Sequence, residues 1–148
     1  MQLSEQWVLV TGGARGLGQS ITRALAREGA GVVINYLHSD AAAQALAEEL
    51  GPRALALQAD VTDAAAVQRL FAQVRERTGQ PISAVVNNAL AQFRFDGDAR
   101  PQIGDITWQR FAQQLEGAVK GALNTTQAAL PAMREQGFGR IVNAVSCT

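Results

Sequence analysis

A glycine-rich turn between an expected strand and an expected helix constrains this chain most. The turn, Thr11 to Gly18, reads TGGARGLG and follows the apolar run Trp7 to Val10. Glycine permits positive φ angles and lets a bound group approach the backbone, while the N-terminus of the following helix presents unpaired N–H groups and a partial positive charge. The turn predicts a nucleotide site. The motif alone leaves open a glycine-rich turn without a ligand.

Apolar runs and helical segments alternate beyond this turn, which predicts an α/β fold with a parallel sheet. Right-handed crossovers and a reversal of winding after the third strand predict a three-layer, Rossmann-type sheet of order 3-2-1-4-5. Thr62 or Asp63 is the expected cap of the third helix, which Gly79 ends. The expected strands are 7–10, 32–34, 54–58, 82–86 and 141–145, and the expected helices are 19–28, 40–50, 63–78 and 107–136.

Polar residues stand where several of these strands end. Asn35, Asp60 and Asn87 follow the second, third and fourth strands. Because ligands of such sheets bind beyond the carboxyl ends of the strands, these residues and the glycine turn are expected to converge on one site. Alternatively, Asp60 caps a turn and Asn87 pairs with loop carbonyl groups.

The expected helix 107–136 carries apolar residues along its whole length. Core packing is the favoured explanation, ahead of a subunit interface, and a helix of this length has faces for both. Between the fourth strand and this helix, a polar loop is expected over residues 90–104. The apolar positions are Phe111, Leu115, Val119, Leu123, Ala129, Leu130 and Met133.

Composition narrows the class of protein. The 148 residues suit a single domain, 1–148, and 47% hydrophobic content with a net charge of zero argues against nucleic-acid and membrane partners. The N-terminus lacks a signal-peptide pattern, so a cytoplasmic location is expected. The single cysteine, Cys147, has no assigned role, and with the single histidine, His38, it makes no metal site.

Taken together, these motifs resemble the short-chain dehydrogenase/reductase family, and most closely its acyl-carrier-protein ketoreductase-like members. Thr11-Gly12-x-x-x-Gly16-x-Gly18 resembles the family's cofactor motif, Asp60-Val61 its adenine-contacting pair, and Asn87-Asn88-Ala89 its Asn-Asn-Ala-Gly motif. Ser146 falls at the position of the catalytic serine, behind the strand that follows Gly139. The cofactor-binding residues that the resemblance implies, together with the strand-end Asn35, are Gly12, Ala14, Arg15, Gly16, Leu17, Gly18, Asn35, Asp60, Val61, Asn87, Asn88 and Ala89.

The sequence departs from this family pattern at three places. Leu90 replaces the usual glycine and brings a side chain close to the cofactor ribose. Ala118 replaces a catalytic asparagine of the proton relay. The Tyr-x-x-x-Lys pair, which in the family supplies the general acid, is absent from these 148 residues, and the single tyrosine, Tyr36, ends the second strand.

These departures separate cofactor binding from catalysis. Ser146 can stabilise a carbonyl oxygen but cannot replace the acid, so little or no reductase activity is expected of the 148 residues alone. A truncated reductase is the leading interpretation, and a non-catalytic nucleotide-binding module or an inactive fragment is the alternative. The fifth strand has an apolar edge, which predicts association through that edge and helix 107–136, most simply as a homo-oligomer.

The end of the second strand favours NADP over NAD as the cofactor. An acidic residue normally binds the ribose 2′-hydroxyl of NAD at this place, but here Asn35 has no charge to repel a 2′-phosphate. Arg15 in the glycine turn can attract that phosphate. Its alternative is an ordinary solvated residue at the start of a helix.

Overall fold

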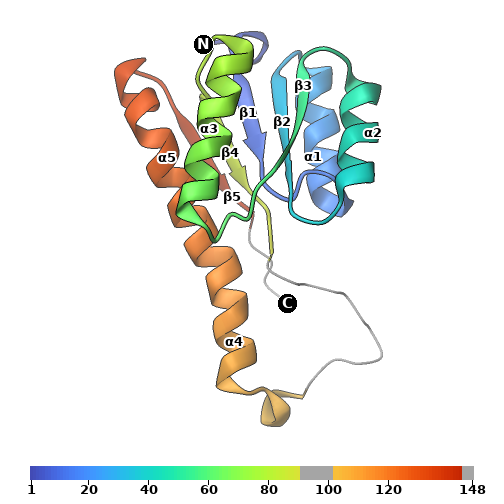
Figure 1. Cartoon of the computed structure of the whole chain (residues 1–148), viewed down its shortest axis with the longest axis vertical. Helices are drawn as coiled ribbons and strands as arrows, with labels where there is room; N and C mark the ends of the chain where they lie inside the picture. The colour runs from blue at the N-terminus through green and yellow to red at the C-terminus, as the bar shows by residue number, and fades with distance from the viewer. Residues whose placement is uncertain (91–101, 145–148) are drawn as a thin grey trace.

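Five parallel strands form the centre of the protein in a computed structural model that describes residues 1–90 and 102–144. The sheet has the order β3-β2-β1-β4-β5, which confirms the predicted Rossmann-type order (Figure 1). The strands are Trp7–Val10 (β1), Gly31–Tyr36 (β2), Ala54–Gln58 (β3), Ala84–Asn87 (β4) and Arg140–Asn143 (β5).

Helices cover both faces of the sheet and complete the three layers. Helices α1 and α2 lie on one face, and α3 and α5 lie on the other (Figure 1). The predicted long helix is divided by a π-helical segment, Glu116–Lys120 (η3). The helices are Gly16–Arg27 (α1), Asp40–Leu50 (α2), Ala64–Thr78 (α3), Trp108–Leu115 (α4) and Gly121–Glu135 (α5), and short 3₁₀ turns span Leu3–Glu5 (η1) and Ile103–Asp105 (η2).

Strand β1 shows why the apolar runs are continuous. Successive side chains of a strand point to opposite faces, so Val8 and Val10 pack toward α1 while Trp7 and Leu9 pack toward α3. All four side chains are buried. Because helices cover both faces, polar residues have no place within this strand.

The caps of α3 follow the predicted pattern. Asp63, one of the two candidates, accepts hydrogen bonds from the backbone N–H groups of Ala65 and Ala66 at 2.9 and 3.2 Å. Gly79 ends the helix in the left-handed conformation, with φ of +70°. Val67, Leu70 and Val74 form its buried face.

The fifth strand begins and ends earlier than predicted. Strand β5 spans Arg140–Asn143, and Val145 lies outside the described residues. Within the described parts of the chain β5 pairs with β4 alone, and Val142 is 53% exposed. The strand is therefore the open edge of this sheet. In residues 1–90 and 102–144, no helix has both the length and the apolarity needed to cross a bilayer.

Core packing is the wrong prediction for the first half of the long helix. Helix α4 and η3 extend past the carboxyl ends of the five described strands, which therefore do not cover them (Figure 1). Ala129 and Met133, further along, are buried against the sheet as predicted. Here the outer stripe denotes the exposed apolar residues of α4, η3 and the first turn of α5, which are Trp108, Phe111, Leu115, Val119 and Leu123.

Candidate functional site

The glycine turn has the geometry that its sequence predicts. Gly12 and Gly16 have positive φ angles of +61° and +55°. Gly18 requires close packing instead, since a Cβ there would lie 2.2 Å from the carbonyl oxygen of Gly12. Thr22 on α1 holds the turn by donating to the carbonyl oxygens of Gly13 and Gly18 at 3.2 and 2.9 Å.

The N-terminus of α1 opens at this turn. Arg15 occupies the N-cap position with extended backbone, and its side chain makes no capping hydrogen bond. Arg15, Gly16 and Leu17 are exposed, whereas Ala14 is buried. The first N–H groups of α1 and its partial positive charge are therefore placed for an anionic group.

Asn88 and Thr11 join the glycine turn to the end of β4. The Thr11 Oγ1 atom accepts hydrogen bonds from the N–H groups of Asn88 and Ala89 at 2.9 and 3.0 Å. The Asn88 side-chain amide donates to the carbonyl oxygens of Thr11 and Gly12 at 3.1 and 3.3 Å. The two motifs that sequence patterns identify separately are thus one hydrogen-bonded unit.

Asn35 joins the turn to the ends of β2 and β3. Its carbonyl oxygen accepts from the N–H group of Gly13 at 3.0 Å, and its side-chain amide donates to the carbonyl oxygen of Ala59 at 3.0 Å. The side chain is nearly inaccessible, with 2% exposure. The amide nitrogen is therefore engaged within the protein, and any contribution of Asn35 to ligand binding passes through the backbone that it holds.

Asp60 and Val61 follow directly at the end of β3. Asp60 Oδ1 accepts from both the N–H group and the Oγ1 atom of Thr62, at 2.8 and 2.7 Å. This is the turn-capping arrangement that the sequence leaves open as an alternative. The turn also fixes the position of Val61, which is half-buried beside α5.

Asn87 lies in a polar chain that connects three elements. Its amide donates to Asn143 Oδ1 on β5 at 2.9 Å, and its own Oδ1 accepts from Thr125 Oγ1 on α5 at 2.6 Å. Asn87 therefore pairs with side chains rather than with the loop carbonyl groups of the alternative interpretation. These hydrogen bonds hold the ends of β4 and β5 against α5.

Four residues of this site are not predicted from the sequence: Thr22, Thr125, Asn124 and Asn143. All four donate or accept hydrogen bonds that hold the glycine turn or the strand ends. The signal for two of them is visible in retrospect, because Asn124-Thr125 interrupts the buried face of a helix with polar groups. The contacts themselves span too many residues to be read from local spacing.

A cavity of about 300 Å³ lies between these strand ends and the projecting helix. Leu90 and Ala118, two of the positions that depart from the family pattern, both line it. Its other walls include Thr11, Val61, Asn87, Ala89, Gly117, Val119, Gly121, Ala122, Asn143 and Ala144.

A second hollow of about 290 Å³ lies between α1 and α2. Its walls include the ion pair of Arg23 and Glu49, whose oppositely charged atoms are 2.7 Å apart and whose side chains are 39% and 51% exposed. A solvent-exposed pair of this kind contributes little to stability. Among residues 1–90 and 102–144, no predicted site residue lines this hollow.

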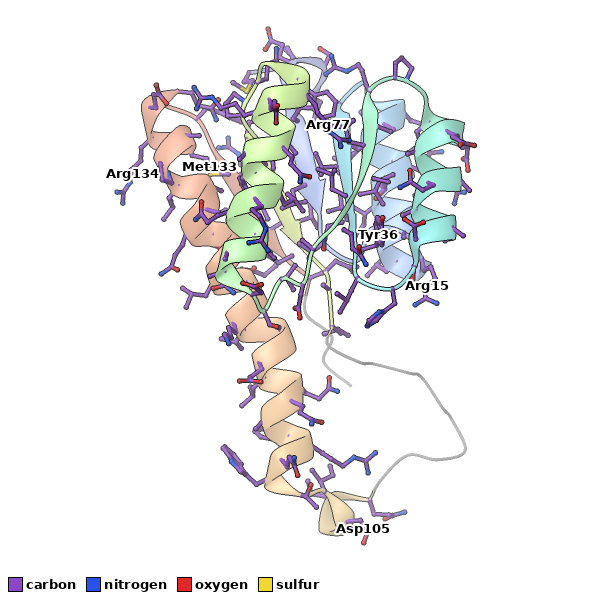
Figure 2. All side chains as sticks on the ribbon, in the orientation of Figure 1. Arg15, Tyr36, Arg77, Asp105, Met133 and Arg134 are labelled. Carbon is purple, nitrogen blue, oxygen red and sulfur yellow. The ribbon has the colours of Figure 1, made fainter. Side chains whose placement is uncertain are left out.

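Tyr36 is held at the same edge of the sheet as Arg15 (Figure 2). Its hydroxyl donates a short hydrogen bond to Asp40 at the start of α2. This hydrogen bond to a carboxylate, with burial of the ring as a further cause, raises the pKa of Tyr36. The protonated phenol therefore fixes the β2–α2 connection.

Ser146, the predicted catalytic serine, lies outside the described residues. The remaining predicted residues do converge, because the glycine turn, Asn35, Asp60–Val61 and Asn87–Ala89 are linked through the contacts above. Together they form the rim, a name used below for these residues. The positive-φ glycines, the close packing at Gly18 and the uncapped α1 terminus fit a pyrophosphate-bearing dinucleotide.

The chain belongs to the short chain dehydrogenase family, whose sequence pattern matches residues 6–148. The resemblance inferred from the motifs is thereby confirmed. Since this pattern covers the rim and the helices behind it, the fold and the motifs point to the same family.

Curated relatives extend this similarity. The chain is 40% identical over 147 residues to a sorbitol dehydrogenase of Cereibacter sphaeroides, which covers 99% of this chain and 54% of the relative. It is 35% identical over 142 residues to a 3-oxoacyl-acyl-carrier-protein reductase of Staphylococcus aureus, covering 93% and 54%. An L-rhamnose 1-dehydrogenase (NAD(P)(+)) of Azotobacter vinelandii is 36% identical over 153 residues, covering 99% and 57%. The chain spans about half the length of these relatives.

Proposed function

We propose that this chain supplies the cofactor site of an oxidoreductase that transfers hydride between a nicotinamide dinucleotide and a carbonyl or alcohol substrate. The observation that carries the proposal is the open N-terminus of α1 behind a glycine turn that Asn88 and Thr11 fasten to β4. Membership of the short chain dehydrogenase family supports it. Gly12, Gly16 and Gly18 would admit the pyrophosphate, and the bound dinucleotide would supply the hydride chemistry.

NADP is the proposed cofactor in preference to NAD. Arg15 is exposed in the glycine turn, and the N–H group of Gly13 in the same turn donates to the carbonyl oxygen of Asn35 in β2, whose side chain carries no negative charge. The nearby carboxylate of Asp40 already accepts the hydroxyl of Tyr36. A ribose 2′-phosphate would therefore meet a positive side chain, while the ribose of NAD would lack an acidic partner.

The substrate is proposed as a class. The relatives' names include a sorbitol dehydrogenase, a rhamnose dehydrogenase and a 3-oxoacyl reductase, whose substrates share an alcohol or carbonyl carbon that exchanges hydride. We assign this chain to the same broad class without choosing among them. Ser146 is proposed to donate a hydrogen bond to the substrate oxygen.

We propose that these 148 residues do not themselves supply the general acid of the reaction. Tyr36, the single tyrosine, is engaged with Asp40 and not free to act as an acid. We therefore propose that the 148 residues alone reduce ketones very slowly. Robust turnover of a panel of ketones with NADPH would contradict this point. A non-catalytic nucleotide-binding module is the second candidate, and the engagement of Tyr36 favours it.

Affinity measurements test the cofactor proposal. Calorimetric titration of the chain with NADPH and NADH should give tighter binding of NADPH. Arg15→Ala should weaken NADPH binding about tenfold and leave NADH binding nearly unchanged, because a charge-assisted contact to the extra phosphate is lost. Arg27→Ala, which removes another exposed arginine of α1, is the matched control. Tighter binding of NADH would reverse the preference, and binding of neither would reject the site.

We also propose that the chain self-associates through the projecting helix. The outer stripe repeats at intervals of three and four residues, so its side chains share one helix face. Trp108 and Phe111 are 75% and 50% exposed and pack on each other at 5.8 Å between ring centroids. An apolar face of this kind on a surface is typical of a contact between proteins. A second copy of the chain supplies the same face, and we propose that the open edge of β5 also takes part in the association.

A further inference from the structure

Beyond the residues of the family motifs, α5 contacts the segment that follows β3. The side-chain amide of Asn124 donates to the carbonyl oxygen of Val61 at 2.8 Å, across 63 positions of the chain. Asn124 is 8% exposed, so this donor is withdrawn from solvent. Leaving a buried amide donor without its acceptor costs free energy, so this hydrogen bond favours one position of the Val61 carbonyl relative to α5.

Gly121 sets the distance between the two elements. A Cβ at this position would lie 2.7 Å from Cγ2 of Val61 and 3.3 Å from its Cβ. Gly121 has ordinary α-helical backbone angles, with φ of −60° and ψ of −46°. The glycine is therefore required by the close approach of Val61 and not by an unusual φ angle. Both residues line the cavity of about 300 Å³.

The other hydrogen bonds of residues 59–62 come from β2 and from within the turn itself. Ala59 is held by Asn35 and by the carbonyl oxygen of Tyr36, and Asp60 pairs with Thr62 within the turn. These bonds fix residues 59, 60 and 62. The Val61 carbonyl is held by a different element, because its hydrogen bond comes from Asn124 on α5.

We propose that Asn124 is a positioning residue for the adenine-binding segment Asp60–Val61, and that Gly121 provides the space for it. This inference rests on the proposed dinucleotide site. The proposed role of Asn124 is indirect and needs no contact between Asn124 and the ligand. Asn124 acts through the Val61 carbonyl, which it holds so that the Val61 side chain and the backbone of Asp60 face the adenine ring.

Asn124→Leu tests this role most sharply, because the variant keeps the approximate size of the side chain and removes its N–H donor without adding a charge. The probes are adenosine 2′,5′-bisphosphate for the adenine end and nicotinamide mononucleotide for the other end, titrated into the whole chain and followed by amide chemical shifts. Affinity for the first probe should fall about tenfold, and affinity for the second should change less than twofold.

Gly121→Ala separates positioning from stability. Alanine favours a helix over glycine, so α5 itself gains, yet the added Cβ displaces Val61. Affinity for adenosine 2′,5′-bisphosphate should fall at least threefold in this variant too. Val74→Ala removes buried volume on α3 without touching the segment, so it should lower stability and leave both affinities unchanged.

The outcomes distinguish this inference from the proposed function. If the parent chain binds adenosine 2′,5′-bisphosphate but Asn124→Leu binds it equally well, Asn124 is not a positioning residue and the cofactor site stands. If Asn124→Leu weakens both probes alike, its effect is general and the positioning role is rejected. If the parent binds neither probe, the cofactor proposal fails and the inference fails with it.

Discussion

The rim of the sheet and the projecting helix place their side chains in opposite ways. At the rim, polar groups are paired with one another, as in the chain from Thr125 through Asn87 to Asn143. Along α4 and η3, large apolar side chains face solvent, with Trp108 75% exposed. The polar groups of the rim therefore hold the glycine turn and the strand ends in place, whereas the outer stripe leaves large apolar side chains in solvent, which is typical of a contact surface.

The largest expected effect comes from filling the closest contact of the rim. Gly18→Ala would put a Cβ 2.2 Å from the Gly12 carbonyl oxygen, so the turn must move. NADPH affinity should fall more than a hundredfold, and the free energy of unfolding should fall by about 3 kcal/mol, at the upper end of overpacking effects. Calorimetry and urea denaturation measure both changes.

Gly104→Ala is the matched control for this variant. A Cβ at Gly104 meets no atom within 4 Å, and its φ angle is not positive. Stability and NADPH affinity should stay within experimental error of the parent. If Gly18→Ala behaves like this control, the glycine turn does not contact the ligand.

A charge placed in the outer stripe should strongly weaken self-association and should change the stability of the monomer only slightly. Phe111→Asp places a charge on a half-exposed position, so the monomer should lose no more than about 0.5 kcal/mol of stability. Sedimentation equilibrium should show the parent associating and the variant as a monomer. Gln113→Asp adds the same charge off the stripe and should associate normally. A monomeric parent would contradict the proposal.

A smaller effect is expected from the polar chain behind the rim. Thr125→Val removes the donor to Asn87 Oδ1 and leaves a buried acceptor unpaired. The free energy of unfolding should fall by about 1–3 kcal/mol. Thr126→Val, at the next and less buried position, should cost much less. Equal losses would mean that the hydrogen bond from Thr125 carries no special weight.

Titration of Tyr36 gives the smallest effect. Its hydrogen bond to Asp40 and its burial raise the folded-state pKa above the ordinary value of about 10. The stabilising contribution is therefore complete below the unfolded-state pKa and is lost as pH rises through the folded-state pKa. As Tyr36 is the single tyrosine, phenolate absorbance reports it directly. Asp40→Asn should lower the measured pKa, and a parent that titrates below the ordinary value would be inconsistent with this contact.

The same contrast explains what could be predicted from the sequence. The apolar runs and the helical segments are local patterns, so they predict which elements form. The crossover rules then limit how these elements can be ordered in the sheet. The convergence of Gly12, Asn35, Asp60 and Asn87 followed from that topology. Periodicity also identified the outer stripe, but it shows which face is apolar and not what covers it, so Phe111 and Leu115 were wrongly expected in the core.

Long-range contacts set the other limit. Asn124 meets Val61 across 63 positions, and Thr125 meets Asn87 across 38. Neither pairing has a local pattern, since each depends on how α5 lies over the strand ends. Such residues emerge from the fold and cannot be assigned from spacing.

Amide chemical shifts of the labelled chain, recorded as NADPH is added, test the central claim most directly. The proposed site predicts the largest shifts at the rim, in Gly12, Gly16, Gly18, Val61, Asn88 and Ala89. Absence of shifts, or shifts confined to the hollow lined by Ser20, Arg23, Arg27 and Glu49, would contradict a dinucleotide site at the carboxyl ends of the strands.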